Sequence, residues 1–118
     1  MKILLTLALF AAVAHAQTPP TVYEPGNGVS LPRVTKEVKP QYTNEAQAQR
    51  IEGTVLLGVV VLNDGSVGDV KVTRSLDSVY GLDVSAVTAM KQWQFVPGTK
   101  DGQPVAVRVA VEMNFTLK

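Results

Sequence analysis

The chain has 118 residues, with 11 Lys and Arg against 10 Asp and Glu, one His and no Cys. This length suits one small domain, and a net charge near zero gives no general attraction for nucleic acid or an anionic membrane surface. The lack of Cys excludes disulfides, thiolate nucleophiles and lipid attachment through cysteine, so the fold must depend on its hydrophobic core.

The first 16 residues, MKILLTLALFAAVAHA, have the pattern of a secretory signal peptide. An apolar run follows Lys2, and Ala14-His15-Ala16 has the small-x-small pattern of a cleavage site, so we expect cleavage before Gln17 and export to the periplasm. The alternative is a retained N-terminal anchor in the inner membrane, but the apolar run is shorter than the ~20 residues of a spanning helix. Cleavage removes the only histidine, and with it His metal sites and Ser-His catalysis.

Residues 17–32, QTPPTVYEPGNGVSLP, are rich in Pro, Gly and Thr and have no apolar period. They predict a flexible leader, with one folded domain over 33–118. The next segment, PQYTNEAQAQRIEG, predicts a short helix that Thr43 or Asn44 caps and that Gly53 ends. Because so short a helix is unstable alone in water, it must pack on the rest of the domain.

A β-hairpin is predicted over Thr54–Leu62 and Val67–Ser75, which are joined by an Asp64-Gly65 turn. Asp64 could also suggest a calcium loop, but the twelve-residue spacing of ligands is missing, which favours the turn. The first strand is apolar on both faces and therefore belongs at the centre of the sheet. Its second face is covered by the leader, by a second copy or by a partner.

The segment YGLDVSAVTAMKQW predicts a second helix that begins at Gly81 or Asp83. Its apolar residues recur at helical spacing: Leu82, Ala86, Met90 and Trp93. We interpret Trp93 as a core residue that closes this helix. The last strand has the clearest pattern, because every second residue from Val105 to Leu117 is apolar, which predicts one buried face.

Together these elements predict an α+β fold with a three-stranded antiparallel-type sheet. Numbered along the chain, its strands take the order 2-1-3, with both helices packed on one face. The third strand then lies at an edge and presents unpaired N–H and C=O groups. An edge like this must be blunted or used for pairing, and we expect it to be used.

Several motifs appear in order at compatible spacings: PQYxxxAQAxRIEGxV from Pro40 to Val55, NDGxVxDV from Asn63 to Val70, GLD at Gly81 to Asp83, and WxFxPG at Trp93 to Gly98. With the closing alternating strand they resemble the C-terminal domain of TonB, the energy transducer of Gram-negative envelopes. The resemblance covers Arg33 to Lys118. Its combination of motifs is specific, although each motif alone is weak.

The resemblance implies a binding module linked to TonB-dependent transmembrane transport, with no catalytic residue, cofactor or metal. In the family, the TonB-box peptide of an outer-membrane transporter adds as a strand to the third strand, which is β-augmentation. The segment before the first helix also contacts the transporter. The partner-binding residues so implied are Val38, Lys39, Pro40, Gln41 and Tyr42, and Val105, Ala106, Val107, Arg108, Val109 and Ala110.

A second hypothesis is a self-associating or structural envelope module without an energy-transducing role, which forms a homodimer through the third strand. An enzyme is the least favoured reading, because Asp64, Asp69, Asp77, Asp83 and Asp101 fall at turns or helix starts.

The inner-membrane motor complex is not expected among the partners. A full transducer has an anchor and a long Pro-rich spacer, whereas the residues between Ala16 and Arg33 span at most ~55 Å.

Overall fold

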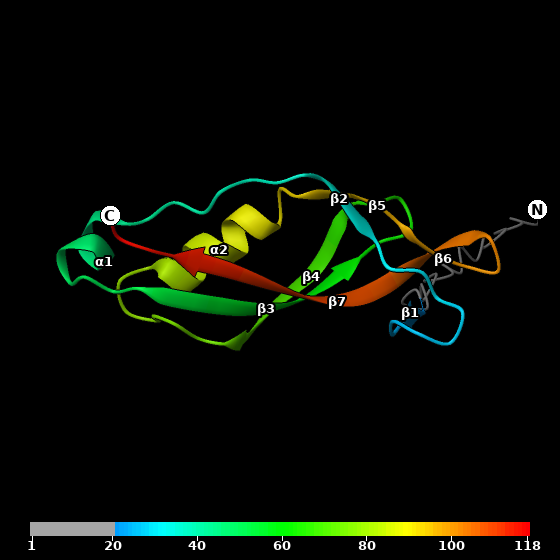
Figure 1. The fold of residues 1–118 in the computed structure, drawn as a ribbon, viewed down its shortest axis with the longest axis horizontal. Coiled ribbons are helices and arrows are strands. Elements are labelled where there is room, and N and C mark those ends of the chain that lie inside the picture. The colour runs from blue at the N-terminus through cyan, green and yellow to red at the C-terminus, as the bar shows by residue number, and fades with distance from the viewer. Residues whose placement is uncertain (1–20) are drawn as a thin grey trace, which may run out of the picture.

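The structure, a computed structural model, describes residues 21–118. The expected signal peptide and the first residues of the leader lie outside the described residues. Within 21–118 no helix has the length and apolarity to cross a bilayer. In chain order the elements are β1 (Val22–Tyr23), β2 (Arg33–Lys36), α1 (Asn44–Ala48), β3 (Gly53–Val61), β4 (Val67–Arg74), α2 (Leu82–Met90), β5 (Gln94–Val96), β6 (Gly98–Lys100) and β7 (Gln103–Phe115) (Figure 1).

The main sheet has β3 at its centre, antiparallel to both β4 and β7. The pairing of β3 with β7 runs without interruption from Gly53 opposite Phe115 to Val61 opposite Val107. This confirms the α+β class and the predicted 2-1-3 order. The short strands β1 and β6, which the sequence did not predict, also pair with β7.

The core lies between one face of this sheet and the helices. Every second residue of β3 is fully buried there: Val55, Leu57, Val59 and Val61. Leu82, Ala86 and Met90 of α2 and Ala46 of α1 belong to the same cluster and are fully buried. Because each large apolar side chain contributes about 1.5–3 kcal/mol on burial, this face accounts for most of the domain's stability.

Helix α1 begins as predicted, since the Thr43 hydroxyl caps it by accepting from the Ala46 N–H at 3.1 Å. Its predicted stop is wrong. The left-handed residue after α1 is Arg50 at φ 55°, whereas Gly53 already begins β3. Glycine is favoured at Gly53 for another reason: its φ of 147° is one that other residues rarely adopt.

Helix α2 begins at Leu82 with Gly81 as its N-cap, but no side chain of these residues caps it. Instead the carboxylate of Asp77, five residues upstream, accepts from the Leu82 N–H at 3.1 Å and from the N–H groups of Val79 and Tyr80 at 2.9 Å. Asp83 in turn accepts from the Asp77 N–H at 3.1 Å. These two carboxylates fix the loop that leads into α2.

The hairpin turn has a second role that its sequence did not indicate. Gly65 has φ 86°, and its carbonyl accepts from the Phe95 N–H at 2.9 Å. A Cβ at Gly65 would lie 2.0 Å from the Phe95 carbonyl oxygen, so only glycine allows this approach. The contact docks β5, which pairs with β2 in a separate antiparallel two-stranded sheet.

Candidate functional site

The outer edge of β7 is the feature of the fold most suited to binding. On its inner side β7 pairs with β3 from Val107 to Phe115. On the opposite side β1 pairs with it in parallel, and only through Val22 opposite Ala106 and Tyr23 opposite Val107. From Arg108 to Phe115 no strand within residues 21–118 pairs with this outer side. The backbone groups along this stretch can therefore accept another strand.

The predicted binding residues on β7 divide into two groups. Val105 pairs with Gly98 of β6, and Ala106 and Val107 pair with β1. Arg108, Val109 and Ala110 lie in the stretch that has no outer partner within the described part of the chain. The first group of backbone positions is thus already paired inside the chain, while the second is available.

The other predicted segment, Val38 to Tyr42, is held at both of its ends. The Val38 carbonyl accepts from the Trp93 indole N–H at 2.9 Å. The Tyr42 ring packs edge-on against Phe115 with 5.4 Å between centroids, and its hydroxyl donates to the Ile51 carbonyl. Between these ends the side chains of Lys39 and Gln41 are exposed, while Pro40 is half-buried. The segment therefore presents two polar side chains on a fixed backbone.

Burial raises the pKa of the Tyr42 phenol above its usual value, and the nearby Glu52 carboxylate raises it further, against a smaller opposite effect of Arg50. The phenol therefore stays protonated near neutral pH. It remains the donor that joins the segment before α1 to Ile51, two residues ahead of β3.

A shallow groove of about 340 Å³ separates this segment from α2. Val38, Lys39 and Gln41 form one wall, and the other wall comes from α2 and the residues after it: Val84, Ser85, Thr88, Ala89 and Gln92. Val84 is 70% exposed at its rim. The groove thus combines an exposed apolar side chain with several polar ones.

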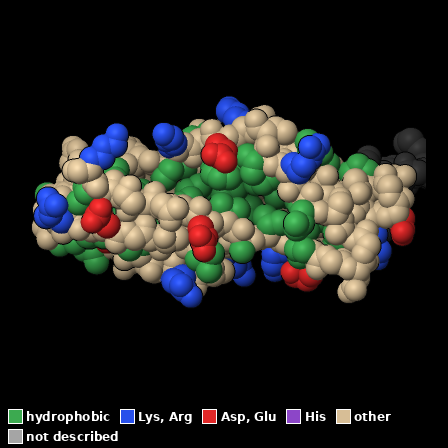
Figure 2. All heavy atoms as spheres, in the orientation of Figure 1, with side chains coloured by type: hydrophobic (Ala, Val, Ile, Leu, Met, Phe, Trp, Pro, Cys, Tyr) green, Lys and Arg blue, Asp and Glu red, His purple; other side chains and the backbone are tan. Residues whose placement is uncertain are grey.

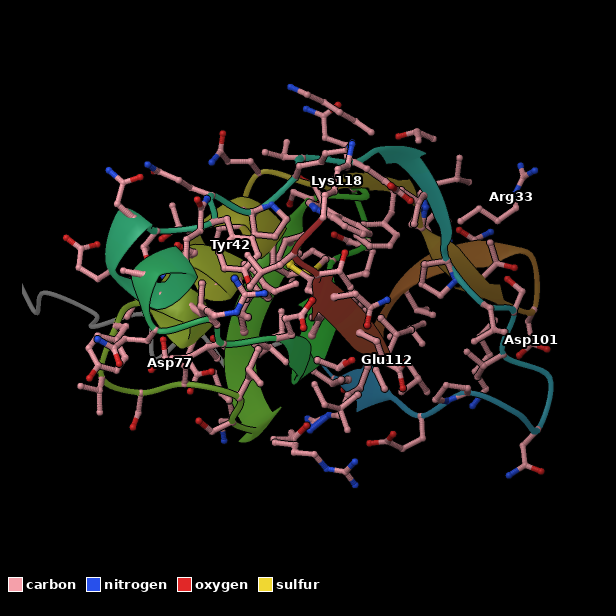
Figure 3. The ribbon with its side chains drawn as sticks, turned by 60° about the vertical axis from the view of Figure 1, so that its left-hand side comes forward. Arg33, Tyr42, Asp77, Asp101, Glu112 and Lys118 are labelled. Atoms are coloured by element: carbon pink, nitrogen blue, oxygen red, sulfur yellow. The ribbon has the colours of Figure 1, made fainter. Side chains whose placement is uncertain are left out.

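The structure does not bring the two predicted groups together. Tyr42 contacts Phe115, at the C-terminal end of β7, whereas Val105 to Ala110 lie in the other half of the strand. Figure 3 shows Tyr42 near α1, with Arg33 and Asp101 at the opposite end of the molecule and Glu112 between them on β7. A ligand strand that reaches both groups has to run along most of β7.

Sequence reasoning missed the contacts that the leader makes with β7 and β6. Glu24 forms an ion pair with Arg108 at 3.5 Å, and the Lys100 ammonium lies 4.7 Å from the centre of the Tyr23 ring. The Val22-Tyr23 pair has high β propensity, and it was the one local hint in a segment otherwise rich in turn residues.

Trp93 packs against the core cluster, as predicted, but its side chain is only half-buried. Its ring lies 6.2 Å from that of Phe95, and its N–H holds the Val38 carbonyl. Trp93 therefore links the core to the predicted binding segment, a positioning role that sequence reasoning did not assign.

Of the acidic residues noted in the sequence, Asp64, Asp77 and Asp83 accept hydrogen bonds that stabilise turns and loops. Hydrogen bonds from the Ser66 hydroxyl and N–H hold the pKa of Asp64 below its usual value. Burial would raise the pKa of Asp77, but its three backbone N–H donors outweigh burial and lower it. Residues 21–118 contain no cluster of three or more acidic, His or Cys side chains that could hold a metal ion.

The surface around β7 is mixed in character. Figure 2 shows hydrophobic side chains gathered along the middle of one face, with Lys, Arg, Asp and Glu mostly around its rim. An apolar middle with a charged rim is common at protein interaction surfaces. The structure is thus that of a small α+β domain whose main sheet has one partly open edge.

Residues 38–117 match the family described as Gram-negative bacterial TonB protein C-terminal, and the chain belongs to this family. It is 36% identical over 88 residues to protein TonB of Vibrio cholerae, covering 72% of this chain and 34% of that protein. Protein TonB of Escherichia coli is 34% identical over 87 residues, 74% of this chain and 36% of that protein. The chain thus spans about a third of the length of these curated relatives.

A solved structure has the same fold. The solution NMR structure of the Pseudomonas aeruginosa TonB CTD matches with a TM-score of 0.61 and 25% sequence identity. The match covers 81% of this chain and 94% of that one. It supports the assignment of the fold independently of the sequence motifs.

Proposed function

We propose that residues 33–118 form a periplasmic domain that binds the TonB-box peptide of an outer-membrane transporter, as part of TonB-dependent transport. The peptide adds as a strand to the outer edge of β7. One observation carries the proposal: this edge already accepts an extended segment, β1, and then continues from Arg108 to Phe115 without a partner in the described chain. The N-terminal 16 residues would direct export and be removed.

The structural support lies in the rigidity of β7. Its inner side is registered against β3 over the whole stretch from Val107 to Phe115, and β3 is anchored in the core. The outer N–H and C=O groups are therefore held in line for an incoming strand before it arrives. A peptide that meets such an edge loses its own conformational entropy, but the domain has little to reorganise.

The Val38 to Tyr42 segment supplies a second contact in this proposal. Lys39 and Gln41 are exposed beside the groove along α2, and Tyr42 fixes the segment to the C-terminal end of β7. Main-chain pairing along β7 would provide affinity with little dependence on sequence. Side-chain contacts at this segment would then discriminate between transporters.

The test is an NMR titration of isotope-labelled Gln17 to Lys118 with a synthetic TonB-box peptide from a transporter of the same organism. We expect shifts along Arg108 to Phe115 and at Val38 to Tyr42. The control is the same peptide with proline at alternate positions, because proline cannot donate to a strand ladder. Equal binding of both peptides would overturn strand addition, and no shifts at millimolar peptide would overturn transporter recognition.

The same edge favours one other candidate function, self-association through β7. A second copy could pair its own β7 with the open stretch from Arg108 to Phe115 and form a symmetric dimer without any transporter. Sedimentation velocity separates the two. A concentration-independent monomer that binds peptide supports the binding module, whereas a tight dimer that ignores peptide supports self-association.

A further inference from the structure

Strand β1 lies on the outer edge of β7, the edge to which we assign the partner. Its two residues pair in parallel with Ala106 and Val107, and Ala106 is only 4% exposed. Ala106 and Val107 adjoin Arg108, where the open stretch begins. A strand that adds along the full edge of β7 must therefore displace β1.

The contacts that hold β1 are few and lie at the surface. Beyond the two paired residues there is the Glu24–Arg108 ion pair, whose side chains are 71% and 52% exposed. The Lys100 ammonium covers the ring of half-buried Tyr23. Exposed ion pairs and cation–π contacts are individually weak, so β1 is held less firmly than any other strand of the main sheet.

The leader is anchored independently of β1. The Ser30 N–H donates to the Thr99 carbonyl at 2.8 Å, the Thr99 N–H donates to the Ser30 hydroxyl at 2.8 Å, and β2 then pairs with β5. Between β1 and this anchor lie Gly26, Asn27 and Gly28, all at positive φ. A turn of this kind lets β1 leave the edge while the rest of the leader stays in place.

We propose that the Val22 to Glu24 segment is a built-in occupant of the β7 edge, which a partner strand must displace to extend its pairing from the open stretch onto Ala106 and Val107. This inference rests on the proposed function and adds a regulatory step to the same site. The segment shields part of the edge from pairing with other chains while no partner is present. Since only the uncovered fraction of molecules can pair along the full edge, apparent affinity is reduced by that fraction.

The test compares two matched double variants of Gln17 to Lys118. Tyr23→Gly with Glu24→Lys removes the ring and reverses the charge within the segment. Leu31→Gly with Glu37→Lys makes the same kinds of change on either side of β2, where Leu31 is 63% exposed and Glu37 is also exposed. Both double variants carry the same net charge, and thermal unfolding checks that each is folded.

Amide hydrogen exchange is measured by NMR without peptide, along Ala106 to Arg108, and the TonB-box peptide is then titrated. In the Tyr23/Glu24 variant we expect faster exchange there and an affinity about fivefold higher, the size expected from loss of a weak intramolecular competitor. The Leu31/Glu37 variant should match the parent in both measurements.

Three outcomes would overturn the proposal that Val22 to Glu24 occupies the edge. They are unchanged exchange at Ala106 to Arg108, faster exchange with unchanged affinity, and equal effects of the two double variants. If neither the parent nor either double variant binds the peptide, the proposed function is contradicted instead. In that case faster exchange in the Tyr23/Glu24 variant alone still supports a leader that covers the edge, and unchanged exchange removes that claim too.

Discussion

The two ends of the molecule are held together by different kinds of contact (Figure 1). At the end with α1 and α2, Leu82 and Ala86 are fully buried and Asp77 bonds three backbone N–H groups. At the end with β1 and β6, the two short strands pair with β7, and the side-chain contacts are an exposed ion pair, a cation–π contact and surface hydrogen bonds. The first end therefore maintains the fold, while β1 at the second end is held by contacts that another chain can replace.

The largest expected effect comes from the buried end. Leu82→Ala removes a fully buried side chain and should lower the free energy of unfolding by about 3–4 kcal/mol through lost transfer energy and a residual cavity. Val84→Ala is the matched control, because Val84 lies on the same helix but is 70% exposed and should change stability by less than about 0.5 kcal/mol. Urea denaturation measures both, and equal midpoints would contradict the placement of the core.

Asp77→Ala should cost about 2–3 kcal/mol, since it leaves three N–H groups near a buried position without their acceptor. Asp69→Ala on β4 is the control, because that side chain is exposed and should have little effect. Guanidinium denaturation at neutral pH measures the difference. A cost as small as that of the control would show that the loop before α2 does not depend on the carboxylate.

The same carboxylate predicts a pH dependence. Its pKa is lower in the folded chain than in the unfolded chain, so its stabilisation is complete above the unfolded value of about 3.9 and is lost as pH falls through the folded value. The stability of the parent should therefore fall more steeply below pH ~4 than that of Asp77→Asn. If the free energies of unfolding of the parent and of Asp77→Asn fall equally with decreasing pH, the lowered pKa of Asp77 does not contribute to stability.

Trp93 packs against the core and also donates a hydrogen bond to the Val38 carbonyl. Its replacement should have a smaller effect than that of Leu82 or Asp77. Trp93→Ala should cost about 2 kcal/mol, because the ring is half-buried against the core. Trp93→Phe keeps much of the packing but removes the bond to Val38, and should cost about 1 kcal/mol. If Trp93→Ala unfolds at the same temperature as the parent, Trp93 is not part of the packing that holds the fold.

The smallest effect on stability should come from the end of the molecule with β1 and β6. Glu24→Lys breaks an ion pair whose partners are both exposed, so the midpoint of thermal unfolding should match that of Glu37→Lys. A clear loss of stability in Glu24→Lys alone would mean that the leader is part of the folding unit. That result would remove the contrast between the two ends.

The sequence predicted those parts of the fold that have local signals. The alternation from Val105 to Leu117 and the Asp64-Gly65 turn between apolar runs each define an element within a short window. The central position of β3 followed from its two apolar faces, and the structure confirms it.

Features that depend on distant contacts were not predictable in this way. Arg50 takes a left-handed conformation that its residue type does not favour, and Asp77 caps a helix from five residues away. The pairing of β1 depends on only two residues of the leader meeting β7. Of the candidate site, the use of the edge of the last strand was expected from the predicted strand order, and the segment before α1 came from the family resemblance. The pairing of β1 with that edge could come only from the structure.

In the proposed function, the outer edge of β7 binds an extended peptide. The most direct measurement is a set of NMR spectra of the uniformly labelled Gln17 to Lys118 protein during titration with the TonB-box peptide. We predict new hydrogen-exchange protection of the backbone amides along Arg108 to Phe115. We also predict chemical shifts at Val22 and Tyr23 that show β1 no longer paired with β7. Protection that stays unchanged along β7 while the peptide binds elsewhere, or no binding at millimolar peptide, would contradict the claim.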